Sequence, residues 1–352
     1  MPTIDSRKSD VEDYYSNVLS SKEDLQTTAC CTDDSLPSYL KPIVSQIHPE
    51  VLARFYGCGS PIPLNLTGAT VLDLGCGTGR DCFTVSRLVG PSGRVIGVDM
   101  TEEQLSVARK HTEFHKNLWG YNQANTDFRS GVIEDLNSVD LADNSVDVVI
   151  SNCVINLSAD KEKVFSEILR VLKPGGELYF SDVFSDRRIP KDLRQDKVMV
   201  GECLGGALYI EDFRRMLFKL GVPDYRVMST SKIDLKNEAI ESKSGNINFY
   251  SMTIRAFKLD IEDRCEDYGQ VAIYRGTIPE SPNNFTLDDH HNFETNRPML
   301  VCSNTAAMVR DTRYQKHFEV IGDESQHFGL FDCAPPAVTT KLEVDDSIGG
   351  CC

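Results

Sequence analysis

The feature that most constrains the fold is a regular alternation of short apolar runs with stretches of helical spacing, which begins near residue 70. Alternation of this kind is typical of parallel strands joined by crossover helices. We therefore predict an α/β fold built on a doubly wound, mostly parallel sheet. The predicted strands cover 70–74, 94–99, 146–151 and 177–181, and the predicted helices cover 80–89, 101–115 and 160–172.

Local signals set the ends of two of these helices. Thr101 with Gln104 three residues later is a capping-box arrangement, which predicts the start of a helix. The run Lys173-Pro174-Gly175-Gly176 predicts a helix end and the turn into the next strand.

The rhythm changes after about residue 230. Two β-like runs, 249–256 and 270–274, are separated by a charged stretch, and a tail with Pro, Thr and Gly doublets follows. We predict four parts from these changes. They are an N-terminal segment over 1–65, the main α/β domain over 66–230, a smaller C-terminal α/β domain over 231–333 and a flexible, Cys-ending tail over 334–352.

Composition narrows the class of partner. The net charge of −16 and the sequence pI near 4.9 argue against nucleic acid and anionic membranes as partners, because a protein surface that binds either one needs cationic side chains. The polar N-terminus lacks the apolar core of a signal peptide, and no run of about 18 apolar residues offers a membrane span. We expect a cytoplasmic protein that binds a small uncharged, cationic or soft ligand.

A glycine-rich turn follows the first predicted strand: Asp73-Leu74-Gly75-Cys76-Gly77-Thr78-Gly79. Its third glycine comes one residue earlier than in the dinucleotide fingerprint, so a pyrophosphate is not the expected ligand. Asp99 ends the second predicted strand, where its carboxylate can accept both hydroxyls of a ribose. Asp73 can face a cationic amino group, and either Ile133 or Glu134, after the third strand, can meet an adenine.

Twelve cysteines are more than the interior of such a chain needs, and none forms a Cys-x-x-Cys pair, so a zinc ribbon or thioredoxin motif is not expected. Cys153 ends the strand 146–151, at the sheet edge where open α/β folds bind ligands. On its own it would be a small apolar filler. Cys58 and Cys203 also stand among glycines, and several thiols around one crevice select a soft ion.

These motifs resemble the class I S-adenosylmethionine-dependent methyltransferases, and more closely the arsenite S-adenosylmethionine methyltransferases. Three motifs of that family stand unbroken: Tyr-Gly-Cys-Gly at 56–59, Ser-Asn-Cys-Val-Ile-Asn-Leu at 151–157 and Gly-Glu-Cys-Leu-Gly-Gly-Ala at 201–207. The match covers about 14–230 and is looser beyond. The resemblance implies a Rossmann-like methyltransferase sheet, with an N-terminal segment that carries thiols and a lid over the cofactor.

The resemblance also implies a function and the residues that perform it. The methyl group of S-adenosylmethionine would move to thiolate-bound trivalent arsenic, giving mono- and dimethylated arsenicals in arsenic detoxification, and disulfide formation would return arsenic to the trivalent state. Cys58, Cys153 and Cys203 would bind arsenic, with Cys30 as a further catalytic thiol, although the adjacent Cys31 is an equal candidate. The implied cofactor-binding residues are Tyr56, Asp73, Gly75, Gly77, Asp99, Met100, Ile133, Glu134 and Asn152.

Further expectations concern partners and the remaining residues. The substrates would be arsenite and methylarsenite, free or as thiol conjugates, with thioredoxin or glutathione as reductant, and the protein would be a monomer. We interpret Cys76 and Cys82 as packing residues and His290-His291 as a surface pair. The vicinal tail thiols Cys351 and Cys352 are expected to be dispensable.

Two rival functions remain open from the sequence. A methyltransferase of a small organic molecule would keep the cofactor motifs, yet it gives no reason for three thiols among glycines. A non-catalytic metalloid sensor would keep the thiols, yet it has no need of Asp73, Asp99 and the glycine turn.

Overall fold

The computed structural model describes residues 36–55, 57–235 and 237–333. Five residues singled out in the sequence lie outside these ranges: Cys30, Cys31, Tyr56, Cys351 and Cys352. Within the described ranges, no helix is both long enough and apolar enough to cross a membrane.

The main element is an eight-stranded sheet with the order β3-β2-β1-β4-β5-β8-β7, and β6 pairs with the far end of β5. Strands β1 to β5 run parallel, whereas β8 is antiparallel to both β5 and β7. The doubly wound, mostly parallel sheet predicted from the sequence is thereby confirmed. The strands are β1 Thr70–Leu74, β2 Arg94–Asp99, β3 Thr126–Ser130, β4 Val146–Asn152, β5 Leu172–Ser185, β6 Leu208–Tyr209, β7 Tyr225–Lys232 and β8 Phe249–Phe257.

Helices cover both faces of this sheet because side chains alternate across a strand. On β1, Val71 faces a core with one set of helices, while Leu72 and Leu74 face the other. The first set is α2 Lys41–Val44, α3 Pro49–Ala53, α4 Arg80–Val89 and α5 Glu102–Lys110, and the second is α7 Lys161–Val171 and α9 Ile210–Lys219.

One predicted helix is wrong in detail. The stretch 101–115 forms two helices, α5 and α6 Thr112–Leu118, with His111 between them. His111 stacks on His48 at 3.7 Å between ring centroids and lies 2.8 Å from Glu50, so tertiary contacts hold the residue at the break. The Thr101 side chain makes no capping hydrogen bond. The backbone N–H of Thr101 instead donates to Asp99 Oδ1 at 2.8 Å.

The C-terminal residues form small sheets around helix α11 Ser303–Arg310. The run 249–256, which was predicted to belong to the C-terminal domain, is β8 of the main sheet. The run 270–274 is β10 of a small C-terminal sheet. The limits of the predicted domains stay a prediction. The remaining elements are α8 Lys197–Gly201, α10 Glu238–Ser244, β9 Glu266–Asp267, β10 Gln270–Tyr274, β11 Asn284–Thr286, β12 Asn292–Glu294, β13 Pro298–Val301, β14 Phe318–Ile321 and β15 Gly329–Leu330.

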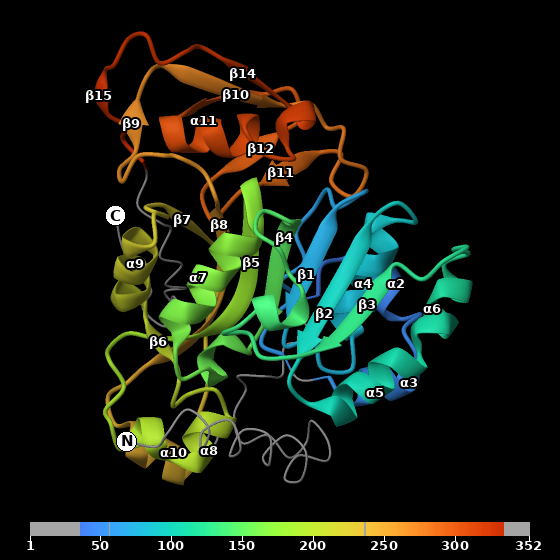
Figure 1. The fold of residues 1–352 in the computed structure, drawn as a ribbon. Helices are drawn as coiled ribbons and strands as arrows, with labels where there is room; N and C mark the ends of the chain where they lie inside the picture. The colour runs from blue at the N-terminus through green and yellow to red at the C-terminus, as the bar shows by residue number, and fades with distance from the viewer. Residues whose placement is uncertain (1–35, 56, 236, 334–352) are drawn as a thin grey trace, which may run out of the picture.

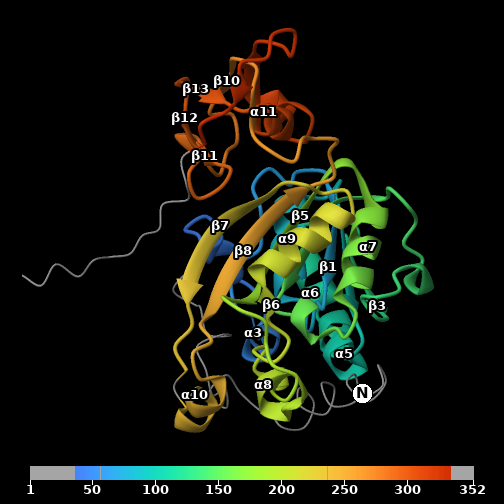
Figure 2. The ribbon, with the colours of Figure 1, turned by 90° about the vertical axis from the view of Figure 1, so that its left-hand side faces the viewer.

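The small sheets lie beyond the amino ends of the parallel strands, opposite α8 and α10 (Figures 1 and 2). Asn65, which precedes β1, donates to the carbonyl of Arg313 at 2.8 Å. Inside this junction a buried ion pair joins Glu177 on β5 to Arg255 on β8. Arg255 also donates to the carbonyl of Leu287 at 2.8 Å, and Tyr314 donates to Glu177 at 3.1 Å.

Removal of Arg255 tests this junction. We expect Arg255→Met to lower the free energy of unfolding by about 3 kcal/mol, because Glu177 would keep its buried charge with Arg313 as its remaining ion-pair partner, and the Leu287 carbonyl would lose its donor. The matched control is Arg214→Met, since Arg214 is half-exposed in a surface pair with Glu211 and should change stability by less than about 0.5 kcal/mol. Urea unfolding followed by circular dichroism measures both, and equal losses in the two variants would contradict the account.

Candidate active site

A cavity opens at the carboxyl ends of β1, β2 and β4 and holds, with its open mouth, about 1170 Å³. This is where ligands bind in open α/β sheets. The structure brings together here all the predicted cofactor-binding residues that it describes, and their individual roles stay a prediction. These residues are Asp73, Gly75, Gly77, Asp99, Met100, Ile133, Glu134 and Asn152.

The glycine turn forms one wall of the cavity. Gly77 has φ +52°, and a Cβ added there would meet no atom within 4 Å, so the turn leaves room for a ligand close to the backbone. Gly75 has φ +70°, and a Cβ there would collide with Val154 at 2.3 Å. The Gly77 N–H donates to Asp99 Oδ2 at 2.9 Å, which fixes the turn against the end of β2.

Buried carboxylates give the cavity its charge preference. Burial, followed by the nearby Asp81, raises the pKa of Asp73 to about 8. Burial also raises the pKa of Asp99. A cationic ligand would relieve both effects, because it stabilises the ionised carboxylates. The amino group and sulfonium of S-adenosylmethionine, together with its ribose, fit this set of acceptors.

The three predicted arsenic ligands come together beside this cavity. Cys58 and Cys153 are joined by a disulfide, with their Cα atoms 5.7 Å apart. The thiol of Cys203 donates to the carbonyl oxygen of Cys153 at 3.5 Å. All three side chains are buried in one apolar cluster, and Cys153 also lines the cavity. Cys153 therefore belongs both to the cysteine cluster and to the wall of the predicted cofactor cavity.

The backbone at two of these cysteines is strained. Cys153 has φ +59° and Cys203 has φ +62°. Residues other than glycine adopt this left-handed backbone conformation rarely, at a cost of about 1–3 kcal/mol. Strain of this kind persists where the surroundings impose it and clusters at functional sites. A packing role alone would be filled at lower cost by glycine, so the geometry favours a chemical role for both thiols.

Asn152 connects the thiols to the cavity wall. Its Oδ1 accepts from the Cys58 N–H at 3.0 Å, while its Nδ2 donates to Gly59 O and Asp81 Oδ2, both at 3.0 Å. A Cβ on Gly57 would lie 2.8 Å from the Asn152 amide, which explains the glycine before Cys58. Asn152 was predicted to bind the cofactor, and its described contacts also hold the loop that carries Cys58.

Sequence reasoning missed Asp182. A carboxylate oxygen of this residue and the sulfurs of Cys58 and Cys153 all lie within 4.8 Å of one another. Burial raises the pKa of Asp182 to about 6, although Asn156 Nδ2 donates to it at 2.7 Å. The only signal in the sequence is a carboxylate inside the apolar strand run of β5, where an unpaired charge would be costly.

Cys76, in the glycine turn, and Cys82, on α4, are both buried in the core, where packing residues were expected, and Cys76 also lines the cavity. The Cys82 thiol donates to Asp73 Oδ2 at 3.2 Å. Burial raises the pKa of both thiols, so they stay protonated at neutral pH. Cys82 therefore also orients the carboxyl group of Asp73.

Comparison with known proteins identifies the family of this chain. Residues 66–221 match the family described as a methyltransferase domain, and residues 267–345 match the arsenite methyltransferase C-terminal domain. An arsenite methyltransferase of Aquipseudomonas alcaligenes is 54% identical over 92% of this chain and 93% of its own length. The human arsenite methyltransferase is 37% identical over 97% of this chain and 96% of its own length.

The chain belongs to the arsenite methyltransferase family. The crystal structure of an arsenic(III) S-adenosylmethionine methyltransferase from Chlamydomonas reinhardtii has the same fold, with a TM-score of 0.82 and 48% identity. It covers 84% of this chain and is itself covered completely. This arsenite methyltransferase is an S-adenosylmethionine-dependent enzyme, as the sequence motifs predicted, and neither rival function is favoured.

The raised pKa of Asp73 predicts pH-dependent binding of S-adenosylmethionine. Below pH 8 the free enzyme holds a proton on Asp73 that a cationic ligand expels, so affinity should rise with pH, by up to about tenfold per unit. Titration calorimetry from pH 6 to 7.5, in buffers of different ionisation enthalpy, measures the affinity and the released proton. In this pH range the α-amino group of S-adenosylmethionine stays mostly protonated, because the pKa of an α-amino group is typically about 7.7–8.0.

The matched control is Asp73→Asn, which should bind S-adenosylmethionine more weakly and with a flatter pH profile. A wild-type affinity that does not change with pH, with no proton released, would contradict the assignment of Asp73.

Proposed function

We propose that this enzyme moves the methyl group of S-adenosylmethionine to trivalent arsenic bound by Cys58, Cys153 and Cys203. The observation that carries this proposal is Cys153, which contacts both other cysteines and also lines the cavity of Asp73 and Asp99. Bound arsenic would thus lie at the wall of the donor cavity. The expected substrates are arsenite and methylarsenite, free or as thiol conjugates.

Substrate binding requires the Cys58–Cys153 disulfide to be reduced first, by two electrons and two protons. Arsenite then exchanges its three hydroxide ligands for three thiolates, and the three thiol protons leave with the hydroxides as water. Asp182, with a pKa near 6, is placed to take up a thiol proton during this exchange. The product is a neutral pyramid whose arsenic lone pair points away from the sulfurs.

The chain's own residues contribute binding and position to the transfer. S-adenosylmethionine supplies an electrophilic methyl group when bound. Asp73, Asp99 and the glycine turn hold the donor, and Asn152 holds the loop of Cys58 at the same wall. Because the thiols are buried, bound arsenic is shielded from water and the two reactants are oriented together. No general base acts on the methyl transfer itself, because arsenic attacks with its own lone pair.

The redox state of arsenic must then be restored. Methylation makes arsenic formally pentavalent, and its return to the trivalent state takes two electrons. We assign these electrons to the thiolates of Cys58 and Cys153: their two arsenic–sulfur bonds break as the two sulfurs form the disulfide, and the methylated arsenic takes up a hydroxide from water with release of one proton. Cys30 would be a further thiol in the relay. Thioredoxin or glutathione would reduce the disulfide again, and a second round would give the dimethylated product. The enzyme would act as a monomer.

Replacement of the arsenic ligands tests the site. We expect Cys203→Ser and Cys153→Ser each to lower methylation of arsenite by at least about a hundredfold, because serine does not bind arsenic as a soft ligand. Mass spectrometry of methylated arsenicals measures the rate, and calorimetry should find S-adenosylmethionine affinity within about twofold of wild type. The matched control is Cys351→Ser/Cys352→Ser, which should retain the wild-type rate. Full activity in Cys203→Ser would exclude it as a ligand.

Omission of the reductant tests the redox cycle. Enzyme that is reduced and then freed of reductant should transfer about one methyl group per chain and stop, since the two electrons from Cys58 and Cys153 are used once. Peptide mapping should then find the Cys58–Cys153 disulfide, and added thioredoxin system or glutathione should restart turnover. Continued turnover without any reductant would refute the cycle.

A further inference from the structure

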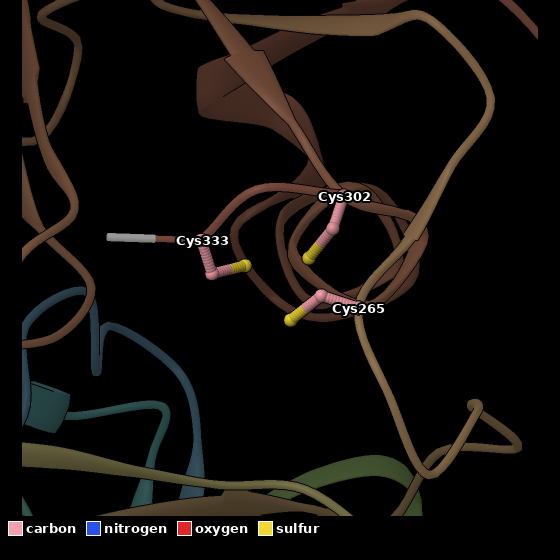
Figure 3. Close-up of side chains that lie close together, drawn as sticks. All are labelled: Cys265, Cys302 and Cys333. Carbon is pink, nitrogen blue, oxygen red and sulfur yellow. The ribbon is translucent and has the colours of Figure 1, made fainter. Parts of the chain in front are cut away.

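A second cluster of thiols lies in the C-terminal part of the chain. Cys265, Cys302 and Cys333 come from segments far apart in sequence, yet their sulfur atoms all lie within 4.8 Å of one another. Figure 3 shows the three side chains turned toward one another in front of α11. Cys302 is buried and the other two are partly exposed, so the cluster is reachable from solvent. We call these residues the C-terminal triad.

The backbone holds the triad in place. The short ladder of β9 with β15 pairs Glu266 with Leu330, and the Phe331 N–H donates to the carbonyl of Cys265 at 2.8 Å. This ladder brings Cys333 close to Cys265. Cys302 is the N-cap residue of α11, and its sulfur accepts from the Thr305 N–H at 3.5 Å. The three thiols therefore converge because of regular backbone pairing and helix capping.

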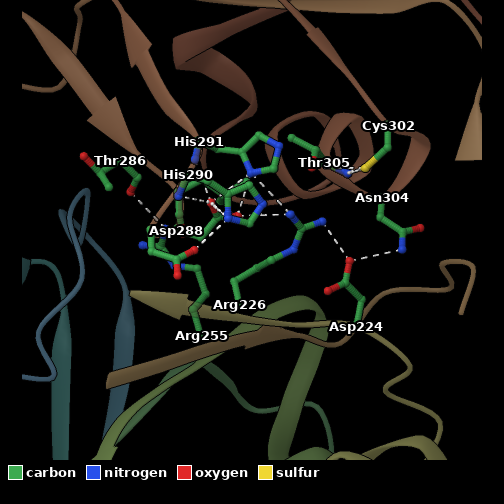
Figure 4. A network of polar contacts seen from close by, with 12 residues as sticks. Asp224, Arg226, Arg255, Thr286, Asp288, His290, His291, Cys302, Asn304 and Thr305 are labelled. Atoms are coloured by element: carbon green, nitrogen blue, oxygen red, sulfur yellow. Dashed lines mark hydrogen bonds and ion pairs between the residues drawn. The ribbon is translucent and has the colours of Figure 1, made fainter. Parts of the chain in front are cut away.

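The surroundings of Cys302 favour a thiolate. A hydrogen bond from Cys265, together with Arg226 and Thr305, lowers the pKa of Cys302 below that of a free thiol. Figure 4 shows how the buried Arg226 is held between Asp224 and Asp288, which lie 2.7 and 3.0 Å from its guanidinium nitrogens. His291, expected at the surface, is buried in the same network against Asp288. The cation is thus already balanced by carboxylates.

We propose that the C-terminal triad is a second binding site for a trivalent arsenical, with Cys265, Cys302 and Cys333 as its three sulfur ligands. It lies beyond the amino edge of the main sheet, whereas the donor cavity lies at the carboxyl edge (Figure 1). Arsenic bound here has no methyl donor beside it. The site takes part in no step of the methyl transfer proposed above.

The number of ligands decides between arsenic and zinc. A structural zinc ion takes four ligands in a tetrahedron, and among the described residues no fourth His, Cys, Asp or Glu joins the triad. Sulfurs bound at about 2.3 Å to one tetrahedral ion lie about 3.8 Å apart, so a triad within 4.8 Å closes on a central atom with small side-chain rotations. Trivalent arsenic needs only three sulfurs and forms a neutral complex, which suits a site beside Arg226, whose charge Asp224 and Asp288 already balance.

Binding at the triad exchanges ligands without a redox step. Three arsenic–oxygen bonds of arsenite break and three arsenic–sulfur bonds form. The three hydroxides leave as three water molecules, which take the thiol protons of Cys265 and Cys333 and, because Cys302 is a thiolate, one proton from solvent. Arsenic stays trivalent and no disulfide forms.

The test counts arsenic per chain in a full-length parent that lacks the other candidate thiols. The parent carries seven changes to serine, at Cys30, Cys31, Cys58, Cys153, Cys203, Cys351 and Cys352. It is reduced with a phosphine, incubated with sodium arsenite, desalted and analysed by elemental mass spectrometry. We expect one arsenic per chain, with three sulfur neighbours by X-ray absorption.

Changing one triad residue should remove this arsenic. In the parent, Cys333→Ser should weaken arsenite binding by at least about a hundredfold, because the remaining two thiols lose the chelate advantage. The matched control Cys76→Ser should leave one arsenic per chain, since Cys76 lies in the methyltransferase core. If the parent does not fold, Cys333→Ser in the wild-type chain should bind one arsenic fewer than wild type.

Three results would overturn the proposal. These are a parent that binds no arsenic, a Cys333→Ser variant that binds as much as its parent, and zinc that binds the triad and excludes arsenite. Methylation by the wild-type chain is assayed separately, so a failure of the proposed function and a failure of the C-terminal triad give different results.

Discussion

The parallel pairing of β1 with β4 is the constraint on which both halves of the active site depend. Leu74 lies opposite Ser151, so the two strands end at the same edge of the sheet. The chain leaves β1 into the glycine turn and leaves β4 into Cys153. On the far side of β4, Asn152 lies opposite Ser181, which brings Asp182 of β5 to the thiols. A shift of this register would separate the donor cavity from the arsenic ligands.

The active site concentrates unfavourable features that the rest of the fold must offset. Asp73 is buried beside another carboxylate, and Cys153 and Cys203 have left-handed backbone conformations. Each feature lowers the stability of the free enzyme. In return, the buried Asp73 would bind the cationic donor, and the strained cysteines would bind arsenic. The large apolar clusters on both faces of the sheet supply the opposing stabilisation. At the other edge, the buried Glu177–Arg255 pair anchors the C-terminal part.

The sequence was sufficient for the parallel sheet and most of the site because both rest on local patterns. Strand runs, the glycine turn and Asp99 follow one another in chain order, and parallel topology then places them at one edge. Long-range contacts were beyond such patterns. The place of β8 depends on antiparallel pairing with β5, and the break at His111 depends on contacts with α3. Asp182 is a single carboxylate without a motif, and the C-terminal triad has no Cys-x-x-Cys spacing.

The central claim is that arsenic binds to Cys58, Cys153 and Cys203 at the wall of the donor cavity. Anomalous diffraction at the arsenic edge, from crystals of the reduced enzyme soaked in arsenite, locates the bound atom directly. The account predicts an arsenic peak within bonding distance of all three sulfurs, next to the cavity lined by Asp73 and Asp99. A reduced Cys58–Cys153 pair without arsenic, in crystals that bind arsenic elsewhere, would contradict it.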